Sequence, residues 1–133
     1  MIVVDASAIL ELLLRTPGSA AIESRIFRHK ETTHVPALLD LEVAQVLRRY
    51  VARGEVAPGR AGVALDLLTG FPMTRYTHEP LLKRIWGLRE NLTAYDAAYV
   101  ALAEALHAPL VTCDARLASA PGIKAEVELF GQP

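Results

Sequence analysis

Two short apolar runs, near opposite ends of the chain, each lead directly into an aspartate. Residues 1–4 read Met-Ile-Val-Val and precede Asp5, and residues 110–113 read Leu-Val-Thr-Cys and precede Asp114. Runs of this length and β-branched content predict buried strands. In a parallel α/β sheet the carboxyl ends of the strands share one edge, where ligands collect. The two runs therefore predict a sheet that carries two carboxylates at the same edge.

Helical patterns separate these runs from further short strands. Strands are expected at residues 1–4, 33–35, 73–76, 109–113 and 125–129. Helices are expected at residues 8–14, 18–29, 37–53, 58–69, 79–90 and 93–107. Strands that alternate with helices imply right-handed crossovers. The predicted fold class is α/β, a three-layer α/β/α sandwich with a central parallel sheet.

The composition fits one compact domain over residues 1–133. Hydrophobic residues make up 52% of the chain, which allows a sizeable core. The net charge of −1 gives no general field to attract a polyanion, so a nucleic acid would have to be held by local patches or by bound metal. Cys113 is the single cysteine, and the chain shows neither a signal peptide nor a membrane-spanning run. We therefore expect a cytoplasmic protein.

Two more acidic residues lie where they can join the first two. Asp96 falls in the first turn of a helix whose residues 97–103 are apolar on nearly every side, so that helix is expected to be buried. Glu42 borders the apolar face of the helix expected at 37–53. Carboxylates that converge with no lysine or arginine among them repel by about 4 kcal/mol per close pair at an effective dielectric of about 20. A divalent cation is the simplest remedy for that repulsion.

Ordinary structural roles compete with this interpretation. Asp5 can cap the helix that follows the first strand, and Asp96 stands where the last residue of a capping box would stand. Asp114 can cap a turn over residues 115–117. A glutamate at the edge of an apolar face, such as Glu42, can also extend its carboxylate into water.

The available donors favour a hard cation. The four histidines show no pair at i and i+4 and no zinc-type spacing, and they are expected at the surface or at an edge. An all-oxygen site selects Mg²⁺ or Mn²⁺, which can activate water and stabilise an in-line phosphoryl displacement through one or two ions. The predicted chemistry is therefore phosphodiester hydrolysis. Asp5 and Asp96 are the expected principal metal ligands, completed by Asp114 and Glu42.

Two hydroxyls are expected to support these ligands. Ser7 lies two residues after Asp5, and Thr112 lies two residues before Asp114. Because residues two apart along a strand point the same way, the hydroxyl of Thr112 and the carboxylate of Asp114 should share a side. We expect Ser7 and Thr112 to orient the carboxylates.

Other functional classes fit less well. The chain has no Walker loop, GxGxxG or GxSxG motif, which argues against nucleotide triphosphatases, dinucleotide enzymes and serine hydrolases. A phospho-receiver domain is the rival from another class, but it needs adjacent acids after the first strand and a lysine at the last. Here Val4 precedes Asp5, and Lys124 lies before the fifth strand. A non-catalytic domain that only binds a partner is the third alternative.

Four segments together resemble one known family. They are residues 2–8, 36–43, 93–103 and 110–114. In their order, their separations and the total length, the chain resembles a PIN-domain ribonuclease of the VapC toxin type. The resemblance implies a Mg²⁺-dependent endoribonuclease, a hydrolase that cuts RNA as the toxin of a type II toxin-antitoxin pair. It also implies a homodimer and inhibition by a VapB-like antitoxin.

The resemblance assigns site residues as well. The family's acidic quartet and strand-end hydroxyls carry over to Asp5, Glu42, Asp96, Asp114, Ser7 and Thr112. Some members carry another acid shortly after the last aspartate, where this chain has Arg116, so a fifth acidic ligand is left open. An acidic pocket that holds cations is open to blockade by an arginine. We therefore expect the antitoxin to lie along the groove beside Glu42 and to place a basic side chain near Asp5 and Asp96.

Overall fold

The computed structural model describes residues 1–131, and the last two residues of the domain predicted for residues 1–133 lie outside the described residues. Five strands form one sheet in the order β3-β2-β1-β4-β5, and every neighbouring pair is parallel. They are β1 (Ile2–Val4), β2 (Thr33–Pro36), β3 (Thr74–Tyr76), β4 (Leu110–Thr112) and β5 (Val127–Leu129). The predicted parallel sheet is confirmed.

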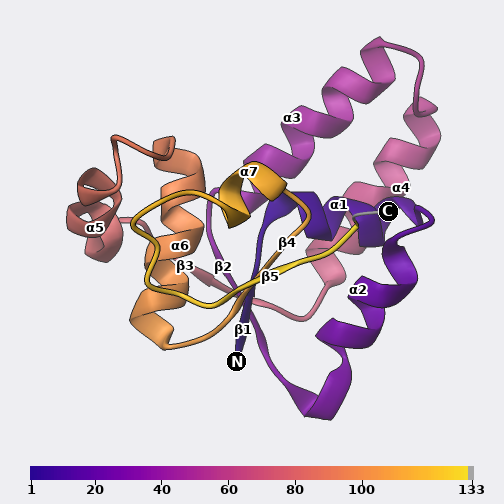
Figure 1. Cartoon of the computed structure of the whole chain (residues 1–133). Helices are drawn as coiled ribbons and strands as arrows, with labels where there is room; N and C mark the ends of the chain where they lie inside the picture. The colour runs from indigo at the N-terminus through magenta and orange to yellow at the C-terminus, as the bar shows by residue number, and fades with distance from the viewer. Residues whose placement is uncertain (132–133) are drawn as a thin grey trace.

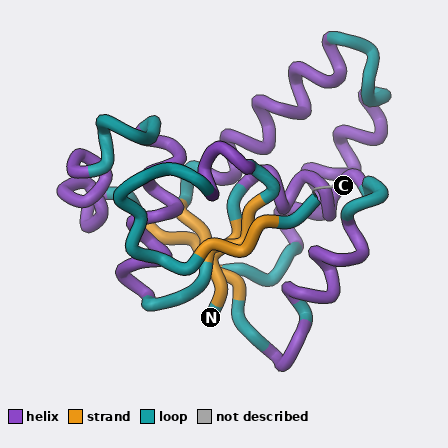
Figure 2. Tube along the Cα trace, viewed as in Figure 1, coloured by secondary structure: helices purple, strands orange, loops and turns teal. Residues whose placement is uncertain are grey.

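Helices cover both faces of this sheet (Figure 1). They are α1 (Ala6–Leu14), α2 (Ser19–Ile26), α3 (Leu39–Ala52), α4 (Pro58–Gly70), α5 (Leu82–Gly87), α6 (Ala94–Leu106) and α7 (Ala115–Ala118). Figure 2 shows the strands between α5 and α6 on one side and α1, α2 and α4 on the other. The predicted three-layer α/β/α sandwich is therefore confirmed. No helix among the described residues is both long and apolar enough to cross a membrane.

The core forms around the strand that comes first in the chain. All three residues of β1 are fully buried, as expected for a central strand covered on both faces. The apolar run at residues 97–103 of α6 is buried throughout, as predicted, and α6 packs on β1 and β2. On the opposite face α1 packs on β4. This packing brings the starts of α1 and α7 to the same edge of the sheet, which is the upper edge in Figure 1.

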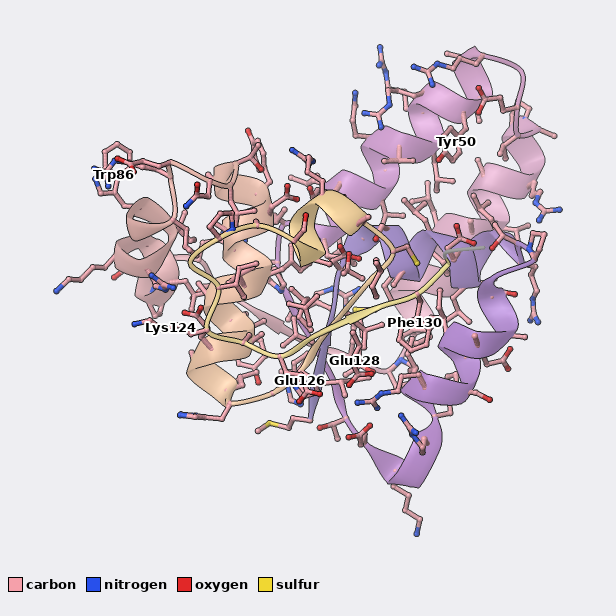
Figure 3. All side chains as sticks on the ribbon, in the orientation of Figure 1. Tyr50, Trp86, Lys124, Glu126, Glu128 and Phe130 are labelled. Atoms are coloured by element: carbon pink, nitrogen blue, oxygen red, sulfur yellow. The ribbon has the colours of Figure 1, made fainter. Side chains whose placement is uncertain are left out.

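The edge strand β5 is fixed to α2 by a buried charge. Arg25 is 7% exposed, and its Nε lies 2.7 Å from Oε1 of Glu128 on β5, which Figure 3 labels. The same guanidinium also pairs with Glu31. A buried arginine needs such partners, because an uncompensated charge in the interior is costly. The two carboxylates therefore allow Arg25 to be buried between α2 and the last strand.

Two details differ from the predictions. The helix expected at 79–90 is a 3₁₀ turn at Glu79–Leu81 followed by the short α5, because Pro80 fits only an initial turn and Gly87 is a poor helix former. The expectation that all histidines lie at the surface or an edge was wrong for His34, which is 7% exposed on β2. Its two ring nitrogens lie 2.7 Å from the hydroxyls of Thr32 and Tyr76, so both are satisfied in the interior.

Candidate metal centre

Asp5 joins the end of β1 to the start of α1. It is the N-cap of α1, and its Oδ1 accepts a hydrogen bond from the backbone N–H of Ala8 at 3.1 Å. Ser7 Oγ donates to Oδ1 at 2.6 Å, and Thr112 Oγ1 donates to Oδ2 at 2.5 Å. Burial raises the pKa of Asp5, while these hydroxyls lower it. Asp5 is thus a helix cap, and the same carboxylate lines the cavity described below.

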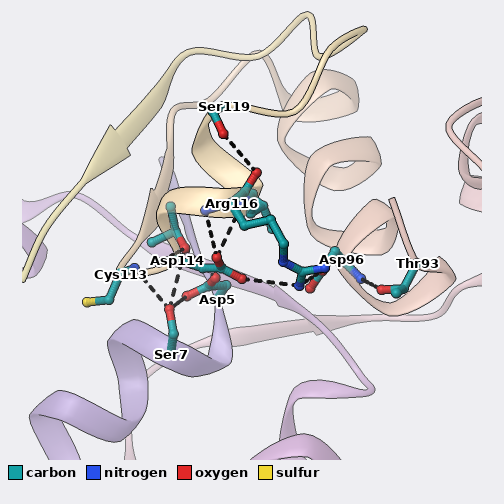
Figure 4. Close-up of polar contacts among 10 residues, drawn as sticks. Asp5, Ser7, Thr93, Asp96, Cys113, Asp114, Arg116 and Ser119 are labelled. Carbon is teal, nitrogen blue, oxygen red and sulfur yellow. Dashed lines mark hydrogen bonds and ion pairs between the residues drawn. The ribbon is translucent and has the colours of Figure 1, made fainter. Parts of the chain in front are cut away.

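The two predicted supporting hydroxyls connect the start of α1 with the end of β4. Figure 4 labels Ser7 with its partners Asp5 and Cys113. Besides donating to Asp5, Ser7 Oγ accepts from the backbone N–H of Cys113 at 2.9 Å. Thr112 Oγ1 accepts from the backbone N–H of Asp114, also at 2.9 Å. Both hydroxyls therefore have a fixed donor and acceptor, and they hold Asp5 in one orientation.

Glu42 reaches the same region from the first turn of α3. It is half-buried, and the hydroxyl of Tyr99 donates to its Oε1 at 2.6 Å. Burial raises the pKa of Glu42, Tyr99 lowers it, and the charges of Asp96 and Asp5 raise it again. The pKa of Glu42 therefore depends in part on the charges of Asp5 and Asp96.

Tyr99 is a site residue that the sequence interpretation missed. Its side chain belongs to the buried run of α6 and is 1% exposed, so the sequence pattern suggested only core packing. The hydroxyl contacts the carboxylate of Glu42 and the backbone of Ala6 at the start of α1. The available signal was that a tyrosine in a fully buried helix needs a partner for its hydroxyl.

Asp96 and Asp114 complete the quartet. Asp96 lies in the first turn of α6, and its backbone N–H donates to the capping hydroxyl of Thr93 at 3.2 Å. Asp114 is the N-cap of α7, where Oδ1 accepts from the backbone N–H groups of Arg116 at 2.9 Å and Leu117 at 3.3 Å. The capping roles that the sequence left open are thus present for Asp5 and Asp114. The other oxygen of Asp114, Oδ2, takes no part in the cap and lies 3.5 Å from Nη2 of Arg116.

One expectation about this cluster was wrong. The four carboxylates were expected to converge with no arginine among them, but Nη2 of Arg116 lies 3.2 Å from Oδ2 of Asp96 and 3.5 Å from Oδ2 of Asp114 (Figure 4). The reason is α7, a single helical turn after Asp114, which directs the side chain of Arg116 toward Asp96 on α6. Burial raises the pKa of Asp96, Arg116 lowers it, and the charge of Asp114 raises it.

The four carboxylates line one cavity of about 410 Å³, together with Ser7, Tyr99 and Arg49. Among residues 1–131, no three acidic, histidine or cysteine side chains are close enough, as they stand, to hold one metal ion. The donors are nevertheless all oxygen, and the charges of neighbouring carboxylates raise the pKa values of Asp5, Glu42 and Asp96. This set suits a hard divalent cation in kind. Binding would require the carboxylates to close in and Arg116 to move aside.

Comparison with known proteins gives a consistent result. The PIN domain family matches residues 2–123. Ribonuclease VapC12 of Mycobacterium tuberculosis is 43% identical over 129 residues, which are 97% of this chain and 98% of that protein. Ribonuclease VapC1 of the same organism is 45% identical over 96% of each chain. The chain belongs to the VapC family of PIN-domain proteins.

A solved structure shares the VapC fold found here. The crystal structure of VapBC2 from Rickettsia felis, bound to a DNA fragment from the promoter, aligns with a TM-score of 0.72. The alignment covers 98% of this chain and all of that one at 14% identity, so it supports the fold alone.

Membership of the VapC family also decides against the phospho-receiver alternative. Lys124, the lysine considered for a receiver, is exposed and lies beside α6 in Figure 3. Its backbone N–H donates to Glu104 at 2.8 Å, and it does not line the acidic cavity. Lys124 therefore does not supply the cavity with the lysine that a receiver domain needs.

Proposed function

We propose that this protein is a metal-dependent endoribonuclease that hydrolyses phosphodiester bonds in RNA. We further propose that it acts in the cytoplasm as the toxin of a VapBC-type pair. The observation that carries the proposal is the convergence of Asp5, Glu42, Asp96 and Asp114 on one cavity, beside the carboxyl ends of β1 and β4. Two relatives above 40% identity that carry the name ribonuclease support it.

In this proposal the acidic cavity holds Mg²⁺ or Mn²⁺. Asp5 and Asp96 would be the principal ligands, with Asp114 and Glu42 completing the set directly or through water. When bound, such an ion supplies an activated water and offsets the charge that develops on the phosphate. The chain's own hydroxyls fix the ligands: Ser7 and Thr112 hold both oxygens of Asp5.

Contacts to the RNA backbone are proposed for α3. Arg48 and Arg49 on this helix and Arg53 at its C-cap are exposed, and Arg49 lines the acidic cavity. A guanidinium pairs well with phosphate oxygens, and a chain with a net charge of −1 needs such a local patch to hold a polyanion. These arginines can therefore position a phosphodiester bond over the carboxylates.

Cleavage of circular RNA tests the proposal. A circle has no ends, so linear products identify an internal cut and distinguish an endonuclease from an exonuclease. We expect the purified chain to convert cellular RNA and a circular RNA to shorter or linear species in Mg²⁺ or Mn²⁺. A folded chain that leaves both RNA samples intact in either metal would contradict the proposal.

Replacement of Tyr99 by phenylalanine is expected to lower kcat about tenfold, because a hydrogen bond to a charged acceptor is lost while the ring stays in the core. The KM for RNA should change less than twofold, because Tyr99 is only 1% exposed and its hydroxyl is already bonded to Glu42. Tyr95→Phe is the matched control, since Tyr95 is 64% exposed on the same helix. Steady-state kinetics with both variants make the comparison. An unchanged kcat for Tyr99→Phe would show that Glu42 does not depend on this hydroxyl.

A groove beside the acidic cavity is our proposed site for a VapB-like antitoxin. It has a volume of about 450 Å³ and is lined mainly by apolar groups, including Leu38, Val46 and the 76% exposed Leu41. Exposed apolar surface of this kind is typical of a protein interface. The groove shares Glu42, Val46 and Arg49 with the acidic cavity. A partner in the groove could therefore place a basic side chain among the carboxylates.

Leu41→Arg is expected to weaken inhibition by the cognate antitoxin more than tenfold while RNA cleavage persists, because it puts a charge into the apolar groove. Leu82→Arg on α5 is the matched control, since Leu82 is also exposed and does not line the groove. Inhibition titrations with both variants provide the measurement. Equal inhibition of the two variants would remove the groove from the proposal.

We also propose that the protein forms a homodimer. The exposed apolar residues Phe27, Val63 and Leu67 on and near the α2 and α4 helices offer an unpartnered surface. Light scattering at high concentration that gave the mass of a monomer would contradict this proposal.

A further inference from the structure

Arg116 is held by two of the proposed metal ligands at once. Its Nη2 lies 3.2 Å from Oδ2 of Asp96 and 3.5 Å from Oδ2 of Asp114. The second oxygen of Asp114 is occupied by the backbone N–H groups at the start of α7. Figure 4 shows the guanidinium reaching from α7 to Asp96. One nitrogen of Arg116 therefore contacts an oxygen from each of two proposed metal ligands, Asp96 and Asp114.

This arginine also offsets part of the negative charge of the cluster. Among the ion pairs within residues 1–131, only those of Arg116 reach any of the four carboxylates, and they reach Asp96 and Asp114. The other paired arginines, Arg25, Arg75 and Arg84, bind acids elsewhere. Arg116 therefore supplies the positive charge in contact with this cluster.

The ion pairs of Arg116 with Asp96 and Asp114 are weak. The side chain of Arg116 is 74% exposed, whereas those of Asp96 and Asp114 are 20% and 30% exposed. An ion pair with so exposed a partner is weak, and a long arginine side chain can extend into water without disturbing the core. The capping of α7 uses the backbone N–H of Arg116 and does not need its guanidinium.

We propose that Arg116 is an internal counter-cation that competes with the divalent ion for Asp96 and Asp114. This inference rests on the proposed metal-dependent function. The guanidinium and the ion cannot share the same oxygens, and two cations that close repel each other. Arg116 therefore raises the metal concentration at which the site fills, and it screens the carboxylates from one another when no metal is bound.

Calorimetric titration of Mn²⁺ into the metal-free protein tests this inference without an activity assay. Arg116→Gln is expected to bind Mn²⁺ about fivefold more tightly than the parent, the scale set by an exposed ion pair. Arg116→Lys keeps the charge and should bind more weakly than Arg116→Gln. Lys83→Gln is the control for loss of one positive charge, because Lys83 is exposed on α5 and does not line the acidic cavity. It should bind like the parent.

Thermal unfolding provides a second readout. In EDTA, Arg116→Gln should melt below the parent, because the carboxylates lose their counter-cation. Saturating Mn²⁺ should then raise its melting temperature by more than it raises that of the parent. Parent-like or weaker Mn²⁺ affinity in Arg116→Gln would overturn the inference and leave the proposed function standing. RNA cleavage by a parent that binds no Mn²⁺ or Mg²⁺ would overturn both metal dependence and this inference.

Discussion

Asp5→Asn and Asp96→Asn are each expected to lower the rate of RNA cleavage by at least about a thousandfold. Asparagine keeps the size of the side chain but removes the negative charge that the proposed cation needs. At Asp5 it also keeps the helix cap, because asparagine is as good an N-cap as aspartate and its oxygen can accept from Ala8. Single-turnover cleavage of a circular RNA measures the loss.

The same variants should fold as stably as the parent or more stably in metal-free buffer. Burial raises the pKa of both carboxyls, so each ionised form is disfavoured in the native state. That penalty is absent below the ordinary carboxyl pKa and grows as pH rises through the raised native value. The advantage of asparagine should therefore be larger at pH 7 than at pH 4. Asp66→Asn, on the exposed face of α4, is the control. Melting well below the parent at pH 7 would show that capping is the main role of the residue.

Chelation of divalent ions is expected to reduce cleavage by the parent to background. The four carboxylates carry more negative charge than the single guanidinium of Arg116 can offset, so a bound cation is needed to balance them and the charge that develops on the phosphate. Mg²⁺ or Mn²⁺ added in excess of EDTA should restore activity, because an all-oxygen donor set prefers hard cations. The measurement is the initial rate of RNA cleavage before and after chelation.

A control is needed to exclude a contaminating nuclease. Asp96→Asn purified in the same way should leave RNA intact in Mg²⁺, whatever the parent does. Activity of the parent that persists unchanged in EDTA, with an inactive Asp96→Asn, would show that the carboxylates act without a metal ion.

The sequence predicted the parallel sheet and the surroundings of Asp5 because their causes are local. The short β-branched run at residues 2–4 predicted a buried strand, and the aspartate that follows it predicted a helix cap; both are found, in β1 and at the start of α1. The apolar run at residues 97–103 likewise predicted a buried α6. In each case the spacing of apolar side chains along the sequence indicates which element forms and that it is buried.

Arg116, Tyr99 and His34 could not be placed in this way. A four-residue helix such as α7 has too few residues to show a period, so nothing indicated that Arg116 would turn back to Asp96. His34 bonds to Tyr76, which is 42 positions away in the sequence, and Tyr99 bonds to Glu42, which is 57 positions away. Such contacts depend on how the helices pack, which composition and periodicity do not specify.

The order of the strands has a consequence for synthesis of the protein. The central strand β1 leaves the ribosome first, but its neighbour β4 pairs with it only after residues 110–112 have been made. A nascent or truncated chain that stops earlier carries Asp5 without the hydroxyl of Thr112 that binds it, and it lacks Asp114 altogether. The four carboxylates thus cannot assemble until residue 114 has been synthesised, long after Asp5 has left the ribosome.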